Sequence, residues 1–205
     1  MTRLAQLRRT VRSRLGIPVV DQFQTDDVID EHINLAIQTI EQEYRWPWQE
    51  AVQTVNTPDD TGVFPVPTNW RATRALVHGR RQVQVVSPID VAMFPTTGAG
   101  DPQIASVVDR TVTLRPAPPE ATVLSHIYYR SPVLLVDDDD EPQMPDEYSP
   151  AIVAKAAELL ALREDDRAAA AAHTAEYQQW LGRMRKDTRR VTGPVTPRIR
   201  PGGWT

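Results

Sequence analysis

Two stripes of apolar residues at helical spacing open the chain. The first consists of Leu4, Leu7, Val11 and Leu15, and the second of Ile29, Ile33, Ala36, Ile37, Ile40 and Tyr44. Stripes of this period are typical of helices with one buried face. Gly16 predicts the end of the first helix, and Thr25 or Asp26 the start of the second. The second helix should stop near Arg45, because the residue before Pro47 is disfavoured in helical geometry.

After Trp48 the pattern changes to short β-branched segments interrupted by Pro, Gly and Asp, which predicts strands joined by turns. The expected strands are residues 51–56, 72–78, 82–86, 104–108, 111–115 and 122–130. Asp109-Arg110 is short enough to join two of them as a hairpin. Ser87, followed by Pro88 and by Asp90, predicts a short helix that interrupts the strands.

Helical spacing returns near residue 148, after a run of acids. The acids lie between Asp137 and Glu147, and Pro142 and Pro145 keep this stretch from being helical, so residues 137–147 should form an exposed acidic linker. The new stripes are Ile152, Val153, Ala156, Leu159 and Leu160, then Tyr177, Trp180, Leu181 and Met184. They predict two helices, with a joint at residues 164–166.

These elements predict an α+β fold in which the two ends of the chain form one body. Helices from residues 1–50 and 148–187 should pack together as a helical body, and residues 51–136 should form an inserted antiparallel β-domain. Residues 188–205 contain arginines, prolines and glycines but no acid. They predict an extended basic tail, because too few apolar groups are present to fold it alone.

Composition narrows the class of protein. The formal net charge is −4 over 205 residues, which disfavours a generally basic nucleic-acid binder, so any basic surface must be local. Cysteine is absent, which excludes disulfides, thiolate metal sites and cysteine nucleophiles. No apolar run approaches the roughly 18 residues of a membrane-spanning helix, so no membrane partner is expected.

The sequence offers no recognisable catalytic, cofactor or metal site. His32, His78, His126 and His173 lie in different predicted elements, without a partner at metal-binding spacing. Gly98-Ala99-Gly100 lacks the rest of a dinucleotide loop. The four consecutive aspartates could attract a cation, but they lack the alternate spacing of a calcium loop, which favours a solvated or partner-facing turn.

The candidate functional residues are therefore ones that contact other macromolecules. In the tail they are Arg189, Arg190, Arg198, Arg200 and Trp204, and in the linker Asp137, Asp138, Asp139 and Asp140. Arginine and tryptophan are common anchors of protein interfaces, and the acidic turn would complement an arginine-rich neighbour. The tail arginines and those of the first helix could instead contact phosphate, although nothing in them supports base recognition.

Three landmarks together resemble the head-to-tail adaptor (connector or neck) proteins of tailed bacteriophages, including the tail tubular protein A type. They are the helix that runs into Tyr44-Arg45-Trp46-Pro47-Trp48, the segment Leu114-Arg115-Pro116-Ala117-Pro118 before a strand ending in Tyr128-Tyr129, and Met144-Pro145-Asp146-Glu147-Tyr148 at the start of a helix. The resemblance covers roughly residues 25–184.

The resemblance implies a structural, non-enzymatic protein of the virion neck, made in the host cytoplasm. It implies a dodecameric ring of identical subunits between the portal protein and the tail or stopper proteins, with a central channel through which the genome passes. No cofactor and only non-specific proximity to DNA follow from it. The alternatives are another neck component, such as a stopper or tail-completion protein, and a DNA-binding protein that uses the basic first helix.

Overall fold

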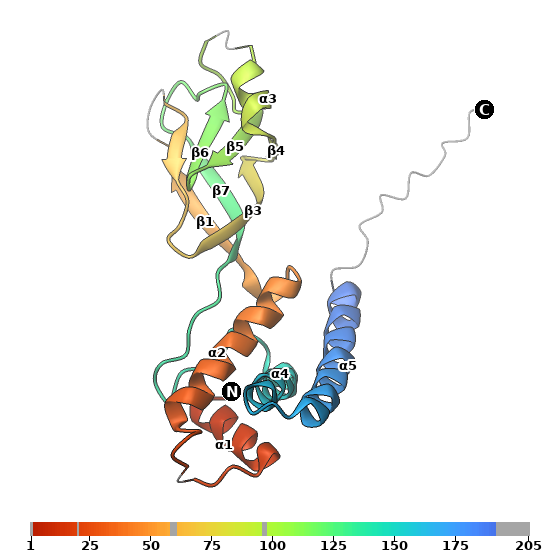
Figure 1. Cartoon of the computed structure of the whole chain (residues 1–205). Helices are drawn as coiled ribbons and strands as arrows, with labels where there is room; N and C mark the ends of the chain where they lie inside the picture. Colours follow the sequence, from red (N-terminus) through yellow and green to blue (C-terminus); the bar gives the residue numbers. More distant parts are fainter. Residues whose placement is uncertain (1, 20, 58–60, 96–97, 192–205) are drawn as a thin grey trace, which may run out of the picture. The chain divides into compact units, whose positions relative to one another are not determined.

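The computed structural model describes residues 2–19, 21–57, 61–95 and 98–191, and these form two compact units. One unit contains the residues up to Pro47 together with those from Val133 onward. The other is the continuous stretch Trp48–Pro132. Figure 1 shows the first as helical and the second as mainly β-structure. None of the described helices combines the length and apolar character that a membrane crossing requires.

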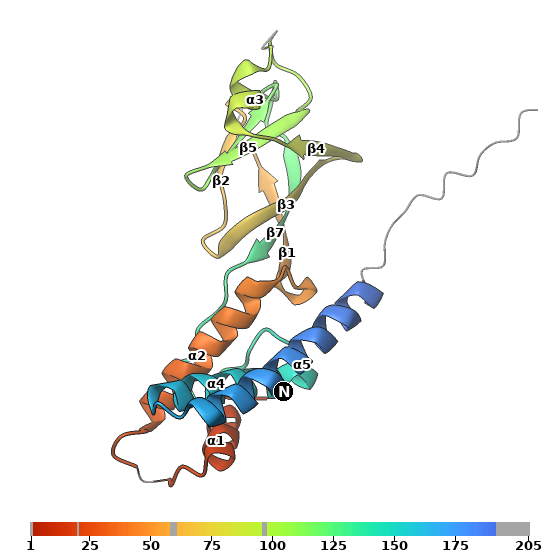
Figure 2. The ribbon, with the colours of Figure 1, turned by 45° about the vertical axis from the view of Figure 1, so that its right-hand side comes forward.

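The helical unit is built around its third helix. It contains α1 (Leu4–Leu15), α2 (Asp26–Glu43), α4 (Ser149–Arg163) and α5 (Arg167–Val191), with a 3-10 turn at Asp146–Tyr148 before α4. Helix α4 contacts each of the other three, as Figure 2 also shows. The predicted packing of the N-terminal and C-terminal helices against each other is thus confirmed.

Alanines explain why α4 can occupy this central position. Its buried residues include Ile152, Val153 and Leu160, but most are alanines: Ala151, Ala154, Ala156, Ala157 and Ala161. A helix that is apolar around most of its circumference is typically buried, and small side chains let the neighbouring helices approach it from several sides.

The β unit is one seven-stranded sheet in the order β1-β7-β3-β4-β5-β6-β2. After a 3-10 turn at Pro47–Gln49, the strands are β1 (Glu50–Asn56), β2 (Val63–Pro65), β3 (Trp70–His78), β4 (Arg81–Val85), β5 (Ile104–Val108), β6 (Thr111–Arg115) and β7 (Val123–Arg130). The first and last strands pair, with Glu50 opposite Tyr129. The chain therefore enters and leaves this unit at adjacent positions.

The sheet is mixed, which corrects the prediction of a purely antiparallel domain. Strands β4 and β5 pair in parallel, with Gln84 opposite Ile104, whereas every other pairing is antiparallel among the described residues. A parallel pair requires a long connection that returns the chain to the same end of the sheet. Residues 86–103, which contain α3 (Pro88–Met93), provide that connection.

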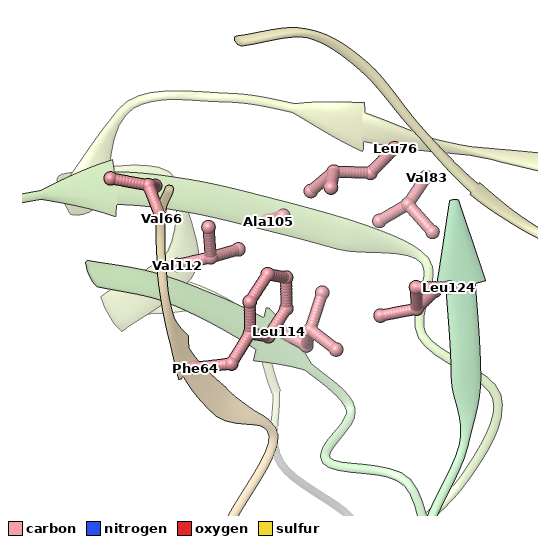
Figure 3. Packing of buried hydrophobic residues seen from close by; sticks show 8 residues of the cluster. All are labelled: Phe64, Val66, Leu76, Val83, Ala105, Val112, Leu114 and Leu124. Atoms are coloured by element: carbon pink, nitrogen blue, oxygen red, sulfur yellow. The ribbon is translucent and has the colours of Figure 1, made fainter. Parts of the chain in front are cut away.

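The curved sheet encloses its own apolar core. Figure 3 shows the cluster, which consists of Phe64, Val66, Leu76, Val83, Ala105, Val112, Leu114 and Leu124. Phe64 comes from β2, which the sequence pattern did not predict. That strand has three residues and ends at a proline, so it is too short to show alternation and depends on pairing with β6.

Local sequence signals in the β unit are confirmed. The Asp109-Arg110 turn has φ values of 45° and 60°, as a tight hairpin between two twisted strands requires. The Ser87 hydroxyl accepts the Asp90 N–H and donates to the Asp90 carboxylate, which is the capping arrangement expected for α3.

The last helix is longer than predicted, which corrects the start of the tail. The joint between α4 and α5 lies at residues 164–166, as expected, but α5 continues to Val191, so residues 188–191 are helical and not extended. Thr188 is buried because it lies one turn beyond Met184 on the same face. The first helix-breaking pair is Gly193-Pro194. The rest of the predicted tail lies outside the described residues.

Candidate partner-binding surfaces

The four consecutive aspartates form a turn that is organised by the last of them. The Asp140 carboxylate accepts the backbone N–H groups of Val136, at 2.7 Å, and Asp137, at 2.9 Å. These two hydrogen bonds keep the pKa of Asp140 below its ordinary value. Asp140 therefore stays ionised and holds the turn, while Asp137, Asp138 and Asp139 are exposed.

The same turn covers the N-terminal end of α1. The carbonyl of Asp140 accepts the Leu4 N–H at 2.9 Å, and that of Asp138 accepts the Ala5 N–H at 3.2 Å. The first N–H groups of a helix have no partner within the helix, and the acidic turn satisfies the first two of α1. Asp139 also forms an ion pair with Arg3 at 2.7 Å. The turn is thus structural within its own subunit as well as exposed.

Most arginines of the first helix are engaged inside the chain. Arg12 is nearly buried and donates to the Asp26 carboxylate at 2.8 Å and to the carbonyls of Pro18 and Gln24. Arg8 pairs with Asp30 and with Asp138, and the hydrogen bond to Asp30 is the main reason that the Arg8 pKa is raised. These contacts leave little of the first helix available to bind phosphate.

The end of α5 presents basic side chains on a well-anchored helix. The Tyr177 hydroxyl donates to Glu43 of α2 at 3.1 Å, and Arg185 pairs with the same carboxylate at 3.1 Å. Lys186 and Arg189 are exposed, and they line an open depression with Gly182 and Arg185. Because the helix axis is fixed on the body, this basic surface has a defined position.

The predicted tail residues fall into two groups. Arg189 and Arg190 belong to α5, whereas Arg198, Arg200 and Trp204 lie outside the described residues. Of the predicted residues, the four aspartates lie together in one turn, and Arg189 and Arg190 lie at the end of α5. A partner-binding role for any of these residues stays a prediction.

Sequence reasoning missed an exposed apolar segment immediately before the acidic turn. Val133, Leu134 and Val136 expose 53%, 52% and 76% of their surface, while Leu135 between them is buried. The side-chain amide of Asn34 holds Leu135 in place: it donates to the Leu135 carbonyl at 2.9 Å and accepts its N–H at 2.8 Å. Val133, Leu134 and Val136 are called the apolar strip below.

The histidines show no arrangement typical of a reactive site. His126 is in the core of the β unit, His32 contacts the Val28 carbonyl one turn before it, and His173 lines a depression of about 270 Å³ with Glu164. Within residues 2–19, 21–57, 61–95 and 98–191, no group of three or more His, Asp or Glu side chains could hold a metal ion.

Comparison with protein families gives the surfaces a context. The family model described as SU10 adaptor protein matches residues 2–198. That is nearly the whole chain, and it includes both units. The chain belongs to the SU10 adaptor protein family. No curated protein matches it.

Membership in this family confirms the resemblance to phage head-to-tail adaptors that the three landmarks indicated. The chain is accordingly a bacteriophage adaptor protein, of a structural family, and its contacts are with other components of the phage head or tail. The functional surfaces of an adaptor are those that bind protein partners. The candidates in this chain are the apolar strip, the acidic turn and the basic surface at the end of α5.

Proposed function

We propose that this adaptor forms a ring of twelve identical subunits at the head-to-tail junction, between the portal protein and the tail or stopper proteins. The observation that carries the proposal is the adaptor family match over residues 2–198. The ring lies in the neck of the virion, and the subunits are synthesised in the host cytoplasm. The genome passes through the central channel, so contact with DNA there is non-specific.

The distribution of surface chemistry supports a ring. Neighbours in a ring meet through two different surfaces of the same subunit, which must complement each other. The helical unit carries an exposed apolar and acidic surface at Val133–Asp139 and a basic one at Lys186 and Arg189. In this proposal Arg189, Arg190, Arg198, Arg200 and Trp204 bind a partner, as do Asp137, Asp138, Asp139 and Asp140.

The proposal is tested by assembling the purified chain on portal rings of the same phage. Twelve chains of 23.1 kDa each add about 277 kDa to every portal ring, which native mass spectrometry resolves from rings of eleven or thirteen. Cryo-electron microscopy of the product locates the added density. A stoichiometric complex at the tail-facing end of the portal is expected, and a chain that stays monomeric and unbound contradicts the proposal.

Assembly on portal rings and a measurement of DNA binding together separate the alternatives. A stopper or tail-completion protein would bind only after another protein had been added to the portal, so a requirement for an intermediate component would favour that function. A DNA-binding protein would bind duplex DNA with an affinity that falls steeply with salt. The ion pairs of Arg8 and Arg12 argue against that alternative, because these side chains already have carboxylate partners.

A further inference from the structure

The apolar strip has the properties of a binding surface for an apolar segment. Three of four consecutive side chains in Val133–Val136 are exposed aliphatics, although burial of such groups is favourable. Asn34 holds the backbone of Leu135 with two hydrogen bonds, and the segment follows α2 (Figure 1). The strip is therefore fixed in place before any partner binds, which reduces the entropy lost on binding.

The acidic turn continues this surface and gives it a charge. The side chains of Asp138 and Asp139 remain 69% and 83% exposed although each pairs with an arginine of the same chain. A partner that fits both parts must combine aliphatic or aromatic groups with arginines. That partner should also lack acids, because like charges across an interface are unfavourable.

The C-terminal residues of the same sequence meet this description. Residues 192–205 contain Val195, Ile199 and Trp204 as apolar groups, Arg198 and Arg200 as cations, and no acid. The alternation in Pro197-Arg198-Ile199-Arg200 suits a segment that meets an apolar surface on one side and carboxylates on the other. Fourteen residues reach at most about 50 Å, which is enough to extend onto an adjoining molecule.

The position of α5 within the helical unit favours a neighbouring copy as the donor. Helix α4 separates most of α5 from α2, and the loop between β7 and α4, which contains the apolar strip, runs beside α2 on the side away from α5 (Figure 1). When two complementary surfaces lie on opposite sides of one subunit, they cannot meet within that subunit. In a closed ring each of them contacts the other surface on a neighbouring subunit.

We propose that residues 192–205 of one subunit bind along the apolar strip and acidic turn of the next subunit. This inference rests on the proposed ring and specifies one of its contacts. Ile199 and Val195 cover Leu134 and its neighbours, and Arg198 and Arg200 meet the exposed oxygens of Asp138 and Asp139. Each subunit then donates one segment and accepts another.

The absence of cysteine from the chain permits a direct test by disulfide cross-linking. Full-length Leu134→Cys and Ile199→Cys variants are mixed in equal amounts, assembled on portal rings and oxidised. A cross-linked dimer that contains one of each variant is the expected product. The double variant should give a ladder of covalently linked chains that extends around the ring.

Leu162→Cys is the matched control, because Leu162 is as exposed as Leu134, at 52% each, and lies at the end of α4. It should not cross-link to Ile199→Cys. Three results overturn the inference: rings that form without the Leu134–Ile199 cross-link, a cross-link confined within single chains, and equal cross-linking of Leu162. In all three the proposed ring survives, whereas a failure to form rings overturns both proposals.

A charge substitution provides an independent measurement. Leu134→Glu should raise the protein concentration required for assembly on portal rings at least tenfold. The reason is that it places an acid where the inference has an apolar group covered by the neighbouring subunit. Leu162→Glu should leave that concentration unchanged. Equal behaviour of the two variants contradicts the inference, and circular dichroism checks that both remain folded.

Discussion

At the scale of single residues, His126 is the most unusual group in the β unit. It is fully buried, its Nε2 lies 2.9 Å from the Thr73 hydroxyl, and no hydrogen bond to its Nδ1 is described. The Trp70 indole donates to the same hydroxyl at 3.0 Å. Burial lowers the pKa of His126 to about 4, because the charged imidazolium is not solvated there.

This shift predicts how stability depends on pH. Between pH 6.5, the ordinary His value, and pH 4, the unfolded chain binds one more proton at this position than the folded chain. The free energy of unfolding should therefore fall as pH decreases through that range, by about 1.4 kcal/mol per pH unit from this group, and level off below pH 4. Urea unfolding at a series of pH values measures it.

Other groups also titrate in this range, so a His126→Gln variant isolates the effect. Glutamine can still accept a hydrogen bond from Thr73 but does not titrate. The stability lost through the substitution should be smaller at pH 4.5 than at pH 7.5, by on the order of 2 kcal/mol. A loss that is the same at both pH values would show that His126 is protonated as easily in the folded protein as in the unfolded one.

At the scale of elements, α5 contains a glycine that its fold does not require. Gly182 is exposed within the helix, and a Cβ atom there would meet no atom within 4 Å. Glycine in a helix interior costs about 0.5–1 kcal/mol relative to alanine. Gly182→Ala should therefore raise the free energy of unfolding by about that amount, as measured by chemical denaturation.

Gly16 provides the opposite case at the end of α1. Its φ is +65° and its N–H donates to the Arg12 carbonyl, so the left-handed conformation is part of the helix cap. A Cβ atom has free space there too, but the backbone conformation is unfavourable for alanine by about 1 kcal/mol. Gly16→Ala should lower stability, and a stabilising effect would show that the cap is not formed.

At the scale of the whole molecule, the β unit should fold without the helices. Its two ends lie side by side because β1 pairs with β7, and its core cluster comes entirely from residues 64–124. A fragment of residues 48–132 should unfold cooperatively on heating, as followed by circular dichroism. In the same fragment Leu114→Ala should lower the free energy of unfolding by about 3 kcal/mol, because Leu114 is fully buried. A fragment without a cooperative transition contradicts this independence.

The sequence alone determined the elements that have a local signal. The helices at Leu4–Leu15 and Asp26–Glu43 follow from apolar stripes and caps, and the Asp109-Arg110 turn from its length between two strands. The α+β class and the adaptor resemblance also came from the sequence. The structure confirms the fold class, and the family match confirms the resemblance. Such features depend on residues a few positions apart, so no tertiary information was needed.

Only the tertiary structure decided which distant groups meet. β2 exists because β6 pairs with it, and β4 and β5 are parallel because the connection through α3 returns the chain to the same end. The acidic turn caps α1 over a separation of more than 130 residues. Asn34 holds Leu135 in the same way and so exposes the apolar strip. These contacts join residues that are far apart in the sequence, and they form only when the whole chain folds. The spacing of residues along the sequence therefore does not predict them.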